Sequence, residues 1–413
     1  MSDVPRERAK CRAFADGERS AGRSQGERQV SERRTPMWTR LAAVALPLVL
    51  ALLLVEVLVR VSGLSSTNHR MVYGGLVVKG RPGSSYVNRS ENRNVVRLNN
   101  RGFHDRDWSA CGEDYGILFL GDSMTEGIQV PVDSLFTSRL EDRLREAGMD
   151  VDVMNAAVSA TGTGHQYLLW KVYIPESNAR IDRIVLCLFP QNDLKNNHVD
   201  LGKGPESYGV YLAPDGTPWV HRDEPAAQTV ARSITNHSAL ANLVYTRLHY
   251  LKTGRGPTDE NVRAAGRAAE GERTAGKADG ERASMERSPE LAEVAADSLW
   301  ADSMRRTLRL IGRWNDEANA SGVGFSVAII PSTDENNFYE DELVRRLVDA
   351  DASGTLDVLA LGLGGRSPLE TNSFDGVTLG HLNYTGHRLA AGEFFDWLAP
   401  ALRSGGRERG EGT

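Results

Sequence analysis

Ser123 lies at the end of a short apolar run, in the segment ILFLGDSMTEG. An apolar run of this length that stops at Gly121 and Asp122 is typical of a buried parallel strand followed by a tight turn. Such a turn would place Ser123 at the carboxyl edge of a sheet, where open α/β folds build their sites. A serine there can act as a nucleophile if a base lies within hydrogen-bond reach. Gly-Asp-Ser alone is more often an ordinary turn, so residues elsewhere in the chain must decide between the two interpretations.

Three further polar segments follow predicted strands and offer the other components of a serine-nucleophile site. Such a site needs a base, a group that orients the base, and donors for the oxyanion. Because the carboxyl ends of parallel strands meet at one edge of a sheet, these segments are expected to share one site. They are residues 155–162 (NAAVSATG), Asn192 and Asp193, and residues 375–387 (DGVTLGHLNYTGH).

The elements that must position these residues alternate between strands and amphipathic helices. This alternation implies a parallel sheet in an α/β fold. The expected strands are residues 117–120, 151–154, 184–189, 325–330 and 356–361. The expected helices are residues 133–147, 164–174, 299–320, 343–350 and 386–402.

Residues 41–59 (LAAVALPLVLALLLVEVLV) form an apolar run that is long enough to span a bilayer as a helix. Trp38 and Arg40 flank one end, Arg60 flanks the other, and Glu56 is the one ionisable residue within the run. Ten Arg or Lys residues lie within residues 1–40, so the positive-inside rule places the N-terminus in the cytoplasm and the rest of the chain outside it. The alternatives are a buried helix and a cleaved signal peptide. An uncleaved anchor fits better, because the run lacks a polar face and no A-x-A site follows it.

The chain divides into regions of different composition. Polar regions without apolar periodicity cannot bury enough surface to offset the entropy of ordering. The expected regions are a disordered basic tail (1–37), a transmembrane anchor (38–62), a juxtamembrane segment with little periodicity (63–110), an α/β domain (111–404) with a flexible Gly-, Ala-, Arg- and Glu-rich insertion (253–296), and a disordered tail (405–413).

Four blocks occur in the chain in a fixed order: GDSMTEG, NAAVSATGTG, PQND and HLNYTGH. In these blocks and their order the chain resembles the SGNH or GDSL hydrolases. The segment Asn100-Arg101-Gly102-Phe103 is similar to one that precedes the nucleophile in membrane-anchored members. The resemblance implies a three-layer α/β/α sandwich with a central parallel sheet, preceded here by one transmembrane helix.

The resemblance also implies a role for each matching residue. Ser123 would be the nucleophile and His381 the general base, with Asp375 orienting the His381 ring. The backbone N–H groups of Ser123 and Ala160, together with the side-chain amide of Asn192, would form the oxyanion hole. Four further residues would support the loops of the site: Gly121, Asp122, Gly162 and Asp193.

Two positions depart from the family pattern. The family usually has Gly where this chain has Ala160, so a loop that needs positive φ there would be strained. The family's Asp usually lies three residues before its His, where this chain has Thr378. Either a longer loop lets Asp375 reach His381, or the enzyme uses a Ser-His dyad in which a backbone carbonyl orients the ring. His387 is expected to pack or cap at the start of the last helix rather than to act as the base.

These features predict a membrane-anchored extracytoplasmic serine esterase that passes an acyl group from an ester to Ser123 and then to water. An O-acyltransferase acting on a cell-surface polysaccharide is the first alternative, since the same residues would serve both reactions. A non-catalytic binding module is the second, favoured by Ala160 and Thr378. The expected partners are an acyl ester of an envelope glycan or lipid, and the membrane. The net charge of -6 argues against nucleic acid, and neither a metal nor another cofactor is expected without a Cys/His cluster.

Overall fold

The computed structural model describes residues 37–62, 69–74, 76–89, 91–108, 114–201, 208–222, 226–253, 289–331, 338–377 and 379–410. The chain forms two compact units, Met1–Leu53 and Leu54–Thr413. Most of the expected N-terminal tail (1–37) and most of the expected insertion (253–296) lie outside the described residues. Helix α1 (Met37–Ser62) is long and apolar enough to cross a membrane, a test of length and composition that a signal sequence also passes.

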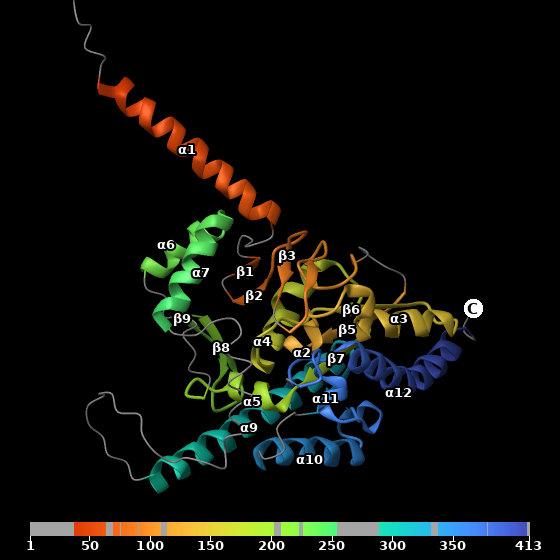
Figure 1. Cartoon of the computed structure of the whole chain (residues 1–413). Helices are drawn as coiled ribbons and strands as arrows, with labels where there is room; N and C mark the ends of the chain where they lie inside the picture. The colour runs from red at the N-terminus through yellow and green to blue at the C-terminus, as the bar shows by residue number, and fades with distance from the viewer. Residues whose placement is uncertain are drawn as a thin grey trace, which may run out of the picture. The chain divides into compact units, whose positions relative to one another are not determined.

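A five-stranded parallel sheet lies at the centre of the second unit (Figure 1), in the order β11-β10-β7-β5-β6. Because β5 pairs with both β6 and β7, the topological switch point of the sheet lies between β5 and β7. All five strands that the sequence predicts are present. They are β5 (Tyr115–Leu120), β6 (Val151–Asn155), β7 (Arg183–Leu188), β10 (Gly324–Ile329) and β11 (Asp357–Ala360).

Helices cover both faces of this sheet, so the fold is the expected three-layer α/β/α sandwich. Successive side chains of a strand point to opposite faces. Ile117 and Phe119 of β5 pack with α3 and α12 on one face, and Leu118 and Leu120 pack with α4, α9 and α10 on the other. These helices are α3 (Phe136–Glu146), α4 (Thr163–Leu168), α9 (Pro289–Ala320), α10 (Phe338–Ala352) and α12 (Tyr384–Gly410).

Short helices and turns complete the sandwich. Several of them follow the carboxyl ends of strands and carry candidate site residues. They are α2 (Ser123–Glu126), α5 (Pro190–Asn197), α11 (Pro368–Thr371), η1 (Val132–Ser134), η2 (Leu169–Tyr173), η3 (Ile174–Ser177) and η4 (Leu363–Gly365).

The segment 63–110, which shows little periodicity in the sequence, contains regular structure. It contains two antiparallel hairpins, formed by β1 with β2 and by β3 with β4. None of these four-residue strands alternates strictly between apolar and polar residues, so the sequence carries no clear strand pattern here. These strands are β1 (Arg70–Tyr73), β2 (Val77–Gly80), β3 (Ser85–Asn88) and β4 (Asn94–Arg97).

Other differences concern the ends of helices and an added subregion. Helix α9 begins at Pro289, inside the expected insertion, and α12 continues to Gly410, into the expected C-terminal tail. Four further elements were not predicted: β8 (Tyr208–Leu212), β9 (Pro218–Arg222), α6 (Ala226–Thr235) and α7 (Ala239–Thr253).

The hairpins of the 63–110 segment are packed into the sandwich. Lys79 on β2 is only 2% exposed, and its Nζ donates to the carbonyl of Arg101 at 2.7 Å while lying 4.2 Å from the ring centroid of Tyr173. The backbone N–H of Val78 donates to His165 Nε2 at 2.8 Å. A buried ammonium needs such partners. The contacts with Tyr173 and His165 fix the segment to the domain that carries the candidate site.

Candidate active site

Ser123 is the first residue of the short helix α2, directly after β5. Asp122 caps this helix by accepting the N–H of Met124 on Oδ1 at 2.9 Å. A Cβ on Gly121 would lie 2.4 Å from Thr125 Oγ1, so the strand can meet the helix this closely only with glycine there. The structure thus places Ser123 on the strand-to-helix turn predicted from the sequence.

Asn192 lies across the switch point from Ser123, on helix α5 after β7. Its Nδ2 donates to Asp122 Oδ2 at 2.8 Å. Since a primary amide has two N–H donors, this bond fixes the side chain and leaves a second donor on the same nitrogen. Asn192 therefore lies at the crevice of an open α/β sheet, just after the strand that neighbours the one leading to Ser123.

Asp193 has the contacts expected of a residue that supports its loop. It is fully buried, and its Oδ2 accepts the N–H of Phe189 at 2.8 Å. Burial raises the pKa of Asp193 well above its usual range, and the nearby Asp122 carboxylate raises it further. Burial likewise raises the pKa of Asp122, against the lowering effect of the hydrogen bonds from Asn192 and Met124. The two acids therefore hold the β5 and β7 loops in place.

Ala160 has a φ of 61°, in the left-handed region that disfavours residues with a Cβ. Ala160 thus has the positive φ that was expected to strain this loop. The preceding residue, Ser159, donates its backbone N–H to Glu126 Oε2 at 2.8 Å and its hydroxyl to the same oxygen. A Cβ on Gly162 would lie 2.5 Å from Asn197 Oδ1, which explains the glycine there. Glu126 and Gly162 together set the path of the loop that carries the Ala160 N–H.

His381 is held by Glu91 through two contacts. Its Nδ1 lies 2.6 Å from Glu91 Oε1, and its backbone N–H donates to Glu91 Oε2 at 2.8 Å. The side chain of Glu91 is 9% exposed and that of His381 is 27% exposed. A Cβ on Gly380 would lie 2.5 Å from Glu91 Oε2, so glycine is required for this approach. The arrangement fixes both the position and the orientation of the imidazole.

The partner of His381 therefore differs from the sequence prediction, which gives this place to Asp375. Asp375 lies in an exposed turn, where its Oδ1 accepts the hydroxyl of Ser373 and the N–H of Val377, each at 2.9 Å. Its carboxylate thus binds residues two positions before and two positions after it in the chain. Glu91 is the group in contact with His381 Nδ1. The ring is therefore oriented neither by Asp375 nor by a backbone carbonyl, the two arrangements expected from the sequence.

The charges around His381 suit a general base. Burial lowers the pKa of His381, but the hydrogen bond and charge of Glu91 outweigh it, and the charges of Asp122 and Glu126 add to the net upward shift. Burial raises the pKa of Glu91, and its contacts with His381 reverse this into a net lowering. An ionised Glu91 can only accept, so the proton of the neutral ring lies on Nδ1 and Nε2 is free to take a proton.

Three asparagines fix the segment that carries Glu91. Their side-chain amides donate to successive backbone carbonyls of residues 128–130, immediately after α2. The bonds run from Asn92 to Gln129 at 2.8 Å, from Asn94 to Ile128 at 3.0 Å and to Val130 at 2.8 Å, and from Asn88 to Ile128 at 3.5 Å. The β3–β4 hairpin and Glu91 at its turn are therefore bound to the same strand-helix unit that positions Ser123.

His387 is fully buried and packs beside this unit. Its Nδ1 accepts the N–H of Phe136 at 3.2 Å, and its ring would lie 3.0 Å from a Cβ on Gly127. Burial, followed by the positive charges of neighbouring groups, lowers the pKa of His387 to about 3. The ring is neutral at physiological pH and its packing role agrees with the expectation for this residue.

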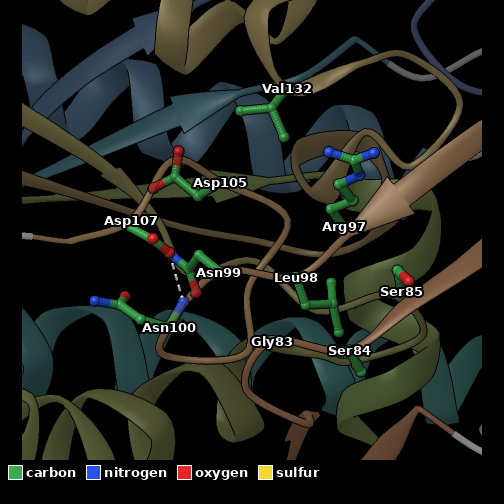
Figure 2. Close-up of a pocket in the computed structure, with 10 residues that line it drawn as sticks. All are labelled: Gly83, Ser84, Ser85, Arg97, Leu98, Asn99, Asn100, Asp105, Asp107 and Val132. Atoms are coloured by element: carbon green, nitrogen blue, oxygen red, sulfur yellow. Dashed lines mark hydrogen bonds between the residues drawn. The ribbon is translucent and has the colours of Figure 1, made fainter.

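A pocket on the same unit lies apart from these residues (Figure 2). Figure 2 shows the N–H of Asn100 donating to Asp107 Oδ1 at 2.8 Å beside it. Ser123, Glu91 and His381 are not among the residues of its lining. That lining consists of Gly83, Ser84, Ser85, Arg97, Leu98, Asn99, Asn100, Asp105, Asp107 and Val132.

Comparison with known proteins gives a short sequence match to an arylesterase and matches to several solved structures. No family model matches the chain. An arylesterase of Vibrio mimicus is 43% identical over 49 residues, which is 12% of this chain. The chain spans 24% of the length of that relative.

The chain also matches solved structures at low sequence identity. They include TesA (12% identity, 69% of this chain and 98% of that chain, TM-score 0.36). They also include the psychrotrophic esterase EstA from Pseudoalteromonas sp. (11% identity, 70% and 100%, TM-score 0.33), and a lipase/acylhydrolase from Enterococcus faecalis (12% identity, 68% and 94%, TM-score 0.33).

Proposed function

We propose that this chain is an SGNH/GDSL-type serine esterase with Ser123, His381 and Glu91 as its catalytic residues. The observation that carries the proposal is the two-point contact of Glu91 with His381. It orients the ring and fixes its tautomer, as the third member of a catalytic triad must. The contact lies in the unit that presents Ser123 and Asn192 at the switch point of the sheet.

The proposed reaction follows from the protons that these residues can hold. Ser123 Oγ attacks the carbonyl carbon of an ester while His381 Nε2 takes its proton, and Glu91 stabilises the resulting imidazolium. The N–H groups of Ser123 and Ala160 and the amide of Asn192 stabilise the oxyanion. Collapse of the intermediate breaks the ester bond, and the alcohol leaves with the proton from His381. Water then attacks the acyl-Ser123 while His381 takes its proton. The bond between the acyl carbon and Ser123 Oγ breaks, His381 returns the proton to Oγ, and the carboxylic acid is released.

The direct test is hydrolysis of p-nitrophenyl acetate by the full chain in detergent. Wild type is compared with Ser123→Ala and with Ser353→Ala, which changes an exposed serine at the end of α10. Release of p-nitrophenol should disappear in Ser123→Ala alone. Turnover that survives Ser123→Ala would assign the reaction to another group.

The same triad would also serve an O-acyltransferase acting on a cell-surface polysaccharide. The two reactions differ in the final acceptor, since a sugar hydroxyl takes the place of water in attacking the acyl-Ser123. Turnover that requires an added polysaccharide, with recovery of the acylated glycan, would assign the transferase reaction. The non-catalytic alternative loses much of its support, because Glu91 supplies the carboxylate that the sequence lacks at position 378.

For the location we propose a single-pass anchor formed by α1, with the N-terminus in the cytoplasm and the α/β domain outside it. Support comes from the apolar length of α1 and from the ten basic residues within residues 1–40. An ester of an envelope glycan or lipid is then the proposed substrate. Protease added to intact cells should digest the α/β domain, and a domain that stays protected until the cells are lysed would contradict this topology.

A further inference from the structure

Helices α6 and α7 form a hairpin with an exposed apolar surface. Figure 1 shows the two helices in green, side by side. On α7, Val244, Leu248 and Leu251 are spaced four and three residues apart and are 48%, 59% and 82% exposed. This spacing places them on one face of the helix. On α6, Val230 and Ile234 are 59% and 54% exposed and four residues apart. We call these five residues the hairpin stripe.

An exposed stripe of this kind is the reverse of what a helix of a water-soluble domain presents. Such helices turn their apolar stripe toward the core, and a contiguous exposed apolar surface marks a site of interaction. Two residues that border the stripe on α7, Tyr245 and Arg247, are themselves exposed. Tyrosine and arginine are typical of the boundary between lipid and water, where the apolar part of the side chain is buried and the polar end stays hydrated.

The turn of the hairpin is bound to the end of the apolar helix α1. Glu56 accepts the hydroxyl of Ser238 at 2.8 Å and the N–H groups of Ala239 and Leu240 at 2.8 and 2.9 Å. Arg60 donates to the carbonyl of His237 at 2.9 Å. All of these residues belong to the second compact unit. The one ionisable residue of the apolar run therefore satisfies N–H groups at the start of α7 that lack partners within the helix.

We infer that the hairpin stripe lies in the interfacial region of the same lipid bilayer that α1 spans. The inference rests on the proposed membrane anchor. Glu56 and Arg60 mark the point at which the apolar run ends, so the hairpin turn bound to them lies at the level of the headgroups. The hairpin stripe begins near this turn, so the nearest apolar environment available to it is the lipid of the bilayer. Helices with such a stripe bind in the plane of the interface, and this contact gives the catalytic domain a second attachment to the membrane.

The test uses the full chain in phosphatidylethanolamine–phosphatidylglycerol vesicles, with single cysteines that carry an environment-sensitive fluorophore. Cys11 and Cys111 are first replaced by serine, and Cys187 is retained because it is buried. Val244→Cys reports on the stripe. Val348→Cys on α10 is the matched control, since both valines lie on helices and are 48% and 43% exposed. Each label is challenged with nitroxide-bearing lipid and with aqueous iodide.

We expect the label at position 244 to show a blue-shifted emission, to lose emission with nitroxide lipid, and to resist iodide. The label at position 348 should show the reverse. Quenching of both labels by iodide to the same extent would overturn the inference. Resistance of position 244 to both quenchers would also overturn it, because a second copy of the chain or another membrane protein would then cover the stripe.

A label at Leu50→Cys, within α1, separates failure of this inference from failure of the anchor itself. Quenching by nitroxide lipid at position 50 but not at position 244 would leave the anchor in place and refute the contact of the hairpin. The absence of lipid quenching at position 50 would refute the anchor. A label at Leu248→Cys should repeat the result at position 244, so the conclusion does not depend on one variant that folds poorly.

Discussion

Replacement of Glu91 by glutamine should disable the site while leaving its shape nearly unchanged. In the wild type, one carboxylate oxygen accepts from the imidazole at 2.6 Å and the other from the backbone N–H of His381 at 2.8 Å. Glutamine has one acceptor and one donor group, so it can satisfy only one of these two donors. If its oxygen stays with the backbone N–H, its NH2 faces Nδ1 and favours the tautomer in which Nε2 carries the proton. His381 could then no longer take the proton of Ser123.

The magnitude follows from the same geometry. A wrong tautomer in a catalytic triad lowers kcat by about 10⁴, which corresponds to about 5 kcal/mol of transition-state stabilisation. If the amide adopts the opposite orientation, the ring keeps its tautomer, but the NH2 then faces the backbone N–H of His381. Leaving that N–H without an acceptor would cost about 1–3 kcal/mol. A cost of this size leaves about one molecule in 5 to 150 in the competent orientation. We therefore expect a loss in kcat of about 10 to 10⁴ for Glu91→Gln, with the larger loss if the wrong tautomer dominates.

The assay is steady-state hydrolysis of p-nitrophenyl acetate, with the pH dependence of kcat/KM. Because Glu91 contributes to raising the pKa of His381, the rising acid limb of kcat/KM, which follows deprotonation of the free base, should move to lower pH in the residual activity of Glu91→Gln. Asp375→Asn is the control, because Asp375 is the rival orienting residue and lies in an exposed turn. Full activity of Glu91→Gln, or an equal loss in Asp375→Asn, would refute the reasoning.

Three further results are expected. Ala160→Gly should raise the melting temperature, since relief of a left-handed φ of 61° stabilises the fold by about 1 kcal/mol; an unchanged or lower melting temperature in a thermal scan would contradict the strain. Glu126→Ala removes the acceptor of Ser159 and should lower kcat by up to about 10² through displacement of an oxyanion donor, with KM little changed; a change in KM alone would give Glu126 another role. His387→Ala should lower the free energy of unfolding by about 2 kcal/mol or more through loss of a buried side chain. His381→Ala should abolish turnover with little effect on the free energy of unfolding. The reverse pattern would make His387 the base.

The sequence alone was sufficient for the parts of the fold that are encoded locally. The strand before Ser123 is a continuous apolar run, and the same pattern marks the strand that leads to Asn192. Because parallel strands present their carboxyl ends at one edge, strand order did not have to be known to bring these segments together. The short hairpins of the 63–110 segment offered no such pattern.

Glu91 could not be predicted for a related reason. It lies 290 residues from His381, in a polar segment that resembles a loop, and its position depends on asparagine contacts to residues 128–130. The one sequence signal was the lack of an acid three residues before His381, which shows that a partner is missing but not where it comes from. The asparagines bind backbone carbonyls that are distant in the sequence, so these contacts cannot be inferred before the fold is known.

Covalent labelling of Ser123 by a fluorophosphonate probe tests the central claim most directly, because the probe reacts with a serine that is activated by its base. The full chain is treated in detergent, and the modified peptide is identified by mass spectrometry. We predict labelling at Ser123 in the wild type and in Asp375→Asn, greatly slowed labelling in Glu91→Gln, and none in Ser123→Ala. A folded wild type that stays unlabelled, or a label on another serine, would contradict the claim that Glu91, His381 and Ser123 form a catalytic triad.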